Sequence, residues 1–221
     1  MKKTIYFLLG LFIFKGFSQN PLQNSPIYGG EQVIIEANNN IKGNDFIFDE
    51  WNKGILVLND SIFSKHEYIR YDAYNDRVLV NYTNKVIEID DNSLTSFSIF
   101  ENKSNVKHDF VKLRRLNFKN EMPSGFYEVV FNVENTNYFI KKNIKFIYDP
   151  NRSKGSQTIN NYPLEYKDKK VYYIKNNEGL YVKVRLKKND IMGILTKNES
   201  LLNNYIKLKK VKRKEFRSLK E

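Results

Sequence analysis

Short runs in which every second residue is apolar dominate the chain between about residues 45 and 186. The runs FYEVVFNV (126–133) and LYVKVRL (180–186) show the pattern most clearly. Strict alternation with a period of two is typical of β-strands that have one packed face and one face exposed to solvent. The pattern therefore predicts a β-rich fold.

Turn-forming residues separate these runs at close intervals. GILVL (54–58), RVLVNY (77–82) and VIEID (86–90) each stop at residues such as Asn, Asp and Ser, and we count roughly nine to eleven candidate strands. The intervals leave no room for crossover helices, so neighbouring strands should pair antiparallel. We predict a mainly β domain over residues 45–187, an antiparallel meander that forms a sandwich or an open barrel. The segment DPNRSKGS (149–156) is predicted to be a surface loop and not a linker between two β units. Neither half of the chain is long enough to bury a stable hydrophobic core by itself.

The stretch YIRYDAYNDRVLV (68–80) predicts a β-hairpin. A two-residue loop at Asn75-Asp76 places Tyr74 opposite Arg77. One face of the ribbon is then apolar or aromatic, with Ile69, Tyr71, Ala73, Val78, Val80 and Tyr82. The other face is nearly all polar, with Arg70, Asp72, Tyr74, Arg77, Leu79 and Asn81. A shift of one residue would mix the two faces, and in this register Arg70 and Arg77 balance the charge of Asp72.

The acidic residues of the same stretch also raise the possibility of a cation site. A calcium loop of the EF-hand type needs a glycine at its sixth position and a distal glutamate. The D-x-x-N-D spacing at 72–76 lacks that glycine, and the neighbouring arginines repel a cation. The stretch is therefore interpreted as a hairpin, and no metal site is expected.

The hairpin belongs to a longer pattern, W-x2-G-x-L-V-L-x-D followed by R-Y-D-x-Y-N-D-x-V. The residues that carry it are Trp51, Gly54, Leu56, Val57, Leu58 and Asp60, then Arg70, Tyr71, Asp72, Tyr74, Asn75, Asp76 and Val78. With this pattern the chain resembles a functionally uncharacterised family of small exported β-rich proteins of low-GC Gram-negative bacteria, over about residues 44–221. The resemblance implies export and a β-rich build, and it supplies no catalytic residues.

The N-terminus has the three parts of a secretory signal peptide. Residues 1–18 contain two early lysines, the apolar run 4–14, and a small-x-small cleavage-site motif at 16–18. The apolar run is too short to cross a bilayer of ~30 Å as a helix. We expect cleavage after Ser18 and export to the periplasm or the extracellular side of the envelope, followed by a flexible leader over residues 19–44. The chain contains no cysteine, so it offers no disulfide and no attachment point for a lipid anchor.

Positive charge is concentrated at the C-terminus. Residues 1–18 hold three of the 37 basic side chains and no acid, which leaves 34 basic and 25 acidic side chains and a net charge of +9. Residues 206–221 hold eight basic and two acidic side chains, a net charge of +6. We expect short helices within residues 188–221. The candidate binding residues for an anionic surface are Lys207, Lys209, Lys210, Lys212, Arg213, Lys214 and Arg217.

This basic segment has three competing uses. It can attract an anionic lipid or glycan surface, at about 1 kcal/mol per cation, with another envelope protein as a related partner. It can bind nucleic acid, but it has no base-reading element or aromatic platform, and export makes that partner scarce. It can also be a solvated helix that only aids solubility.

No group of residues in the sequence points to catalysis. The motifs G-x-S-x-G and G-x-x-x-x-G-K-[ST] are absent. The two histidines, His66 and His108, lack the spacing of metal ligands and are expected to be solvated turn residues. The acidic pairs at 49–50 and 90–91 are adjacent and are expected in turns. We expect a non-enzymatic binding or structural module without a cofactor; the alternative is a hydrolase that acts on an envelope polymer through carboxylates that converge only in the fold.

The 15 tyrosines and 16 phenylalanines leave two further alternatives. They can form a face that stacks on carbohydrate, or the girdles of a small outer-membrane barrel. Several candidate strands fall short of the ~9 residues needed to span a membrane, and the final residues are charged, which disfavours the barrel. Most of these aromatic residues are expected to fill the core.

Overall fold

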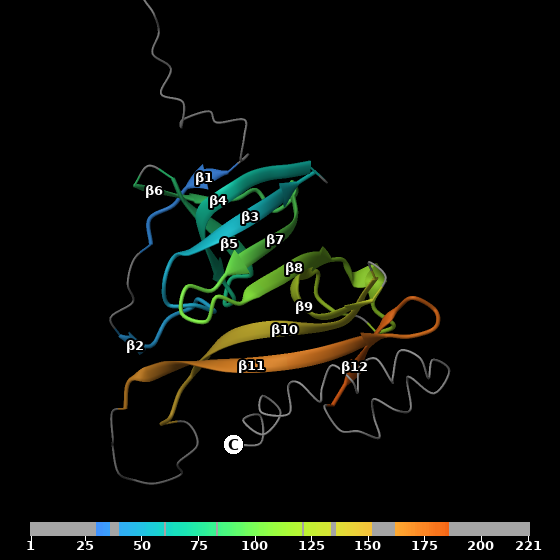
Figure 1. Cartoon of the computed structure of the whole chain (residues 1–221). Helices are drawn as coiled ribbons and strands as arrows, with labels where there is room; N and C mark the ends of the chain where they lie inside the picture. Colours follow the sequence, from blue (N-terminus) through green and yellow to red (C-terminus); the bar gives the residue numbers. More distant parts are fainter. Residues whose placement is uncertain are drawn as a thin grey trace, which may run out of the picture.

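The computed structural model describes residues 30–35, 40–59, 61–82, 84–120, 122–133, 136–151 and 162–185, and for residues 61–66, 133 and 136–138 it describes the backbone alone. These residues form twelve strands and one short 3-10 helix (Figure 1). The strands are β1 (Glu31–Gln32), β2 (Ile41–Lys42), β3 (Asn52–Leu58), β4 (Ser61–Asp72), β5 (Arg77–Tyr82), β6 (Lys85–Glu88), β7 (Leu94–Phe100), β8 (Lys107–Leu113), β9 (Gly125–Val133), β10 (Thr136–Tyr148), β11 (Leu164–Lys175) and β12 (Tyr181–Val184). The 3-10 helix η1 is Arg115–Asn117. The predicted mainly β structure is confirmed.

All twelve strands belong to one open sheet. Their order is β1-β6-β5-β4-β3-β7-β8-β9-β10-β11-β12, and β2 pairs with β11. Strands β3 to β6 form one antiparallel meander, β7 to β12 form a second, and the pairing of β3 with β7 joins the two. The pairing of β2 with β11 is parallel. The prediction of a mostly antiparallel sheet is therefore confirmed, and the sheet does not close into a barrel.

Two hydrophobic cores lie on opposite faces of this sheet. The larger core contains Leu56, Leu58, Ile69, Tyr71, Ala73, Val78, Val80, Ile89, Leu94, Phe97, Ile99, Phe110 and Phe126. The smaller core contains Leu113, Phe118, Tyr127, Ile140, Val171, Tyr173 and Tyr181. Phe126 and Tyr127 are adjacent on β9, and successive side chains of a strand point to opposite faces. The sheet thus changes its packed face at β9, and the prediction of a single packed face for 126–133 is wrong at the start of this strand.

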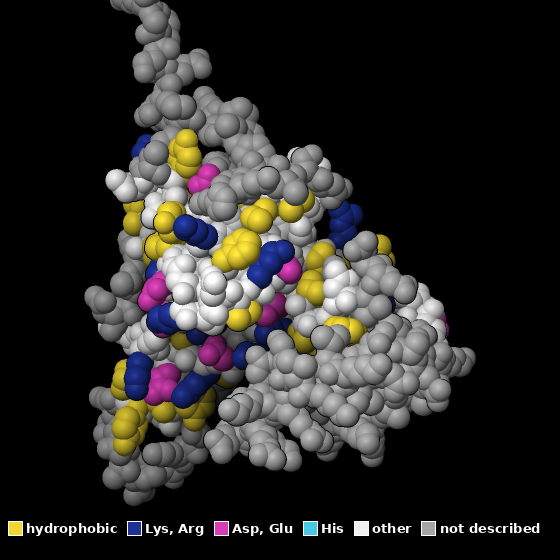
Figure 2. All heavy atoms as spheres, in the orientation of Figure 1, with side chains coloured by type: hydrophobic (Ala, Val, Ile, Leu, Met, Phe, Trp, Pro, Cys, Tyr) yellow, Lys and Arg dark blue, Asp and Glu magenta, His cyan; other side chains and the backbone are white. Residues whose placement is uncertain are grey.

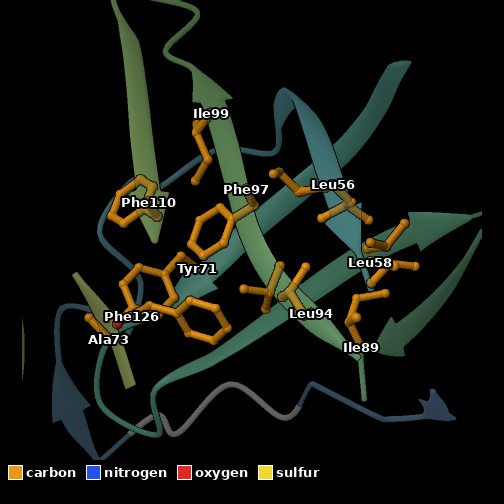
Figure 3. Close-up of a cluster of buried hydrophobic side chains, with 13 residues drawn as sticks. Leu56, Leu58, Tyr71, Ala73, Ile89, Leu94, Phe97, Ile99, Phe110 and Phe126 are labelled. Carbon is orange, nitrogen blue, oxygen red and sulfur yellow. The ribbon is translucent and has the colours of Figure 1, made fainter. Parts of the chain in front are cut away.

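Aromatic rings fill one end of the larger core. The rings of Phe97 and Phe110 stack with centroids 4.5 Å apart, and Tyr71 meets Phe110 edge-on at 5.3 Å. Phe126 completes the group, with its ring 5.1 Å from that of Phe97 (Figure 3). Each such pair contributes about 0.5–1.5 kcal/mol beyond the burial of its area. The expectation that aromatic residues fill the core is confirmed for these rings.

The predicted hairpin is present, but its register differs from the expected one by two residues. Asp72 pairs with Arg77, so residues 73–76 form a four-residue loop in place of the predicted two-residue loop. The side chain of Asp72 explains the longer turn, because its Oδ1 accepts the backbone N–H groups of Tyr74 at 3.1 Å and Asn75 at 2.9 Å. A shift of two residues preserves the side of the ribbon that each residue faces, so the predicted apolar face packs into the larger core.

The polar face of the hairpin is buried in part, at Asp72 and Leu79, whereas Tyr74 on the same face is exposed. Asp72 has no solvent exposure, and its carboxylate is neutralised by Arg77, whose Nε lies 2.8 Å from Oδ2. The expected second partner, Arg70, lies elsewhere. Its guanidinium is 4.8 Å from the ring centroid of Phe46 and 5.0 Å from that of Trp51. Stacking between two aromatic rings is a favourable environment for an arginine and takes it away from Asp72.

The tip of the hairpin is anchored to β9 and β10 by Asp76. Its Oδ2 receives the Nζ of Lys142 at 2.6 Å, and its Oδ1 accepts the backbone N–H of Phe126 at 3.3 Å and the hydroxyl of Tyr71. A Cβ on Gly125, which has φ of +148°, would lie 1.8 Å from Asp76 Oδ2, so this approach requires glycine. The contact joins the first meander directly to the second.

Several predictions concern residues outside the described ranges. The signal peptide (1–18) and the short C-terminal helices (188–221) are among them. Strands β1 and β2 fall within residues 19–44, the segment predicted to be a flexible leader. Strands β10 and β11, which flank the predicted surface loop at 149–156, pair over ten positions. In the described ranges no helix is long and apolar enough to cross a membrane.

Candidate functional site

A polar pocket of about 230 Å³ lies beside the larger core. One side is apolar, with Ile47, Phe48, Ala73 and Ile144, and the polar lining residues are Glu101, His108, Glu128, Lys141, Asn143, Lys145, Asp168, Lys169 and Lys170. Phe110 pairs with Glu128, and Glu128 pairs with Lys141. Paired residues of neighbouring strands project from the same face of a sheet. The floor of the pocket is therefore a polar continuation of the larger core, on β8, β9 and β10.

Glu128 is the centre of a buried hydrogen-bond network in this floor. Its Oε1 lies 2.9 Å from Nδ1 of His108 and 2.8 Å from Nζ of Lys141. Its Oε2 accepts a hydrogen bond of 2.6 Å from Nδ2 of Asn143. Glu128 and Asn143 are buried, with 6% and 7% of their surface exposed. A charged group at this depth is tolerated only when it is paired and hydrogen-bonded, as Glu128 is.

The network fixes the charge of Glu128. Burial tends to raise the pKa of this carboxyl group, but the hydrogen bond with His108, the charge of Lys141, and the hydrogen bonds from Lys141 and Asn143 outweigh burial and lower the pKa to about 2. The group is therefore ionised throughout the physiological range. An ionised carboxylate accepts the N–H of the imidazole and orients the ring.

The second nitrogen of His108 has no hydrogen-bond partner in the described part of the protein. This Nε2 is buried, and Oε2 of Glu101 lies 3.7 Å from it, beyond hydrogen-bonding distance. The ring also packs at 5.0 Å against Phe48, a wall of the pocket. His108 thus connects two glutamates, one tightly and one loosely, at the edge of the pocket.

The chemistry of the pocket is that of its charged and amide groups. No lining residue in the described ranges carries a hydroxyl or thiol group that His108 could activate as a nucleophile. Glu128, with a pKa of about 2, cannot serve as a proton donor near neutral pH. No group of three or more His, Asp or Glu side chains among the described residues is placed to hold a metal ion. What the pocket offers is charged and polar groups held rigidly beside an aromatic ring.

Lysines gather on the hairpin formed by β10 and β11, which borders the pocket. The two strands contain seven lysines and two acids, a net charge of +5. Lys145 is paired with Asp168, Nζ to Oδ1, at 2.9 Å, whereas Lys170 is exposed and forms no ion pair with a described residue. Figure 2 shows basic and acidic side chains interspersed where β11 runs across this face. Glu128 and Asp76 neutralise Lys141 and Lys142, so the net positive charge that remains on the hairpin beside the candidate site is +3.

The structure describes few of the residues that the sequence suggested for function. All the candidate binding residues from Lys207 to Arg217 lie outside the described ranges. The expectation of solvated turn histidines is wrong for His108, which lies on β8 in the buried network. His66 lies in β4, not in a turn, and its side chain is outside the described set. The acidic pair at 90–91 is in a turn, as expected, where Asp90 Oδ1 accepts the backbone N–H of Asn92.

Sequence reasoning missed the His108–Glu128–Lys141 network because its members come from three strands. In FYEVVFNV the alternating pattern predicts that the glutamate faces solvent. The only available signal was the interruption of an otherwise apolar strand by one acid, facing a lysine across the next turn.

Comparison with protein-family models, with curated proteins and with solved structures finds no match for this chain.

Proposed function

We propose that this protein is an exported, non-enzymatic binding module of the bacterial cell envelope, which contacts an anionic surface or partner through its basic regions. The family resemblance and the signal-peptide pattern support export. The partner is an anionic lipid or glycan surface, or another envelope protein with an acidic face. The basic residues of 206–221 are one part of the contact, and the β10–β11 hairpin is the other.

The observation that carries this proposal is the charge of the β10–β11 hairpin. Seven lysines against two acids lie on two paired strands, so the antiparallel register concentrates positive charge that is dispersed in the sequence. A concentrated positive surface attracts anionic partners, at about 1 kcal/mol per cation near a charged membrane. Of the seven lysines, Lys141 and Lys142 are neutralised by Glu128 and Asp76, and Lys145 and Lys167 pair with the two acids of the strands. The charges of Lys169, Lys170 and Lys175 remain, a net of +3.

Removing residues 206–221 is expected to weaken retention of the mature chain on anionic vesicles, because net charge falls from +9 to +3. Retention is measured by co-sedimentation at low and at physiological salt, with neutral vesicles as the control. Salt should reduce the binding of both forms, since exposed charges are screened. Equal retention of the full and shortened chains at low salt would contradict the contribution of this segment.

A hydrolase that acts on an envelope polymer is the second candidate. The specific observation in its favour is that Glu101, Glu128 and Asp168 all line one pocket with His108. Its weakness is that Glu128 is fully occupied by three partners and remains ionised, which removes the proton donor that hydrolysis of a glycosidic bond requires.

The two candidates differ in their response to Glu101→Gln, which changes a carboxylate that lines the pocket beside His108. Under the binding proposal, no hydrolysis of envelope polymers is detected by reducing-end or amine release with either the unchanged protein or this variant. Hydrolysis by the unchanged protein that this single substitution abolishes would establish the enzyme and reject the binding module. Glu178→Gln, at an exposed turn, is the matched control.

A further inference from the structure

The outer half of the β10–β11 hairpin presents aromatic and basic side chains in adjacent rows. The antiparallel register places Phe146 opposite Lys167 and Tyr148 opposite Glu165. Paired residues share a face, and residues two apart on a strand also share it. These four side chains, with Lys169 as the next residue of the row on β11, therefore lie on one face of the hairpin. We call them the aromatic–lysine ladder.

The aromatic members of the ladder are exposed although they are large and apolar. Phe146 is 38% exposed and Tyr148 is 37% exposed. Tyr162, just before β11, is 47% exposed. Its backbone is held in place by Asn151, whose Nδ2 donates to the Tyr162 carbonyl at 3.0 Å and whose Oδ1 accepts the Tyr162 N–H at 3.2 Å. Phe146 and Tyr148 thus present two exposed rings on one face of β10, and exposed apolar surface of this kind is typical of an interaction surface.

The charged members of the ladder are arranged around these rings. The Nζ of Lys167 lies 5.6 Å from the ring centroid of Tyr148 and 2.5 Å from Oε2 of Glu165. Lys169 is exposed and forms no ion pair with a described residue. One carboxylate thus stands among two lysines and two rings, which gives the surface hydrogen-bond donors, one acceptor and flat apolar faces.

We propose that the aromatic–lysine ladder binds an acidic polysaccharide, a chain of sugar units that carry carboxylate groups. The apolar faces of sugar rings pack on Phe146 and Tyr148, and the sugar carboxylates pair with Lys167 and Lys169. Glu165 accepts hydrogen bonds from sugar hydroxyl groups. This acceptor is the reason to prefer a hydroxyl-rich glycan, because every sugar unit carries hydroxyl donors for it, whereas an ionised phosphate group carries none. The inference rests on the proposed function, whose anionic partner it specifies.

The strand geometry suits an extended polymer. Side chains two residues apart on a strand are separated by roughly 6.6 Å, so Phe146 and Tyr148 present two successive platforms along one line. The lysines follow the same line on the neighbouring strand. A polymer laid along the hairpin therefore meets Lys169, then Phe146 with Lys167, then Tyr148 with Glu165, a row longer than a single small ligand would need.

The test uses the full mature chain and polygalacturonate oligomers as the probe, with binding measured by calorimetry or by affinity electrophoresis. Phe146→Ala combined with Tyr148→Ala should weaken binding about tenfold, through the loss of two ring contacts. Lys167→Gln combined with Lys169→Gln should weaken it and reduce its salt dependence. The matched controls are Val130→Ala, an exposed apolar residue on β9, and Lys53→Gln, an exposed lysine on β3, which should leave binding unchanged.

Unfolding curves of all variants establish that the fold is intact, since the substituted residues are exposed. Absence of polygalacturonate binding, or equal binding by the aromatic double variant, would overturn the inference. So would tighter binding of single-stranded DNA or of anionic vesicles through the same four side chains. Suppose that the ladder variants bind polygalacturonate as tightly as the unchanged chain does, and that this binding disappears when residues 206–221 are removed. That result would overturn this inference and leave the proposed function standing.

Discussion

Glu128→Gln is expected to lower the free energy of unfolding by about 3 kcal/mol, a large effect for a change that preserves shape. The amide keeps one acceptor oxygen but loses the charge that balances Lys141, whose side chain is only 19% exposed. It also places an N–H group against at least one of the three donors that now surround the carboxylate. Breaking a buried ion pair by removing one partner leaves an uncompensated charge in a poorly solvated site.

The measurement is urea unfolding of the unchanged protein and the variant at neutral pH. Glu178→Gln is the control, because the side chain of Glu178 is 63% exposed and its contact with Lys119 is long, at 3.8 Å. This control should leave the unfolding midpoint unchanged. A loss of stability in Glu128→Gln no larger than that of the control would show that the network contributes nothing.

The effect of Glu128→Gln should also depend on pH in one direction. The carboxyl group has its pKa lowered from 4.5 to about 2 in the folded protein. A lowered pKa contributes stability that is fully present above the unfolded value and is lost as pH falls through the folded value. The difference in unfolding free energy between the unchanged protein and the variant should therefore be constant above about pH 5 and shrink between about pH 4.5 and 2. A difference that grows in this range would contradict the assignment.

The sequence was sufficient to predict most strands but not the way in which they share a core. Apolar runs that end at turn residues located β3 and β5 closely, and alternation located β9, because a strand with apolar residues at every second position has one stable way to pack. Alternation cannot show that Phe126 and Tyr127 serve two different cores. That arrangement depends on the sheet changing its packed face at β9, which involves residues far apart in the chain.

The hairpin at 68–80 illustrates where local reasoning succeeds and where it stops. The side on which each residue lies was predicted correctly, since a shift of two residues does not alter it. The loop length was wrong, because the carboxylate of Asp72 accepts two backbone N–H groups and stabilises a longer turn. Of the two partners predicted for Asp72, Arg77 is present and Arg70 is not. Arg70 instead stacks on two rings contributed by residues about twenty positions earlier.

The candidate site was not predictable, because each of its charged residues has an ordinary local context. His108, Glu128 and Lys141 come from three consecutive strands and meet only through the register of β8, β9 and β10. The ladder on β10 and β11 was not predictable for the same reason. Its aromatic residues and lysines come from two strands, and only the register of these strands places them side by side. By contrast, the basic C-terminus was conspicuous in the sequence because its charges are consecutive.

Asp76→Asn is expected to destabilise the protein by about 3 kcal/mol, for a reason that a second substitution can isolate. The asparagine still offers an acceptor to the hydroxyl of Tyr71 and to the N–H of Phe126. It no longer balances the charge of Lys142, whose side chain is 10% exposed and whose Nζ lies 2.6 Å from the Asp76 carboxylate. Burial lowers the pKa of Lys142, and the charge of Asp76 opposes that effect, so the variant leaves a cation that the site cannot solvate.

Lys142→Met in the Asp76→Asn background should restore most of the lost stability, because a methionine fills the space without a charge. The double variant is thus expected to be more stable than the Asp76→Asn single variant, and urea unfolding of the four proteins of the cycle measures the coupling. If the double variant were less stable than the unchanged protein by the sum of the two single effects, the two residues would be independent, and the hairpin tip would not be held to β10 by this pair. If the coupling is large, the Asp76–Lys142 pair holds the hairpin tip to β10, in addition to the pairing of β3 with β7 that joins the two meanders.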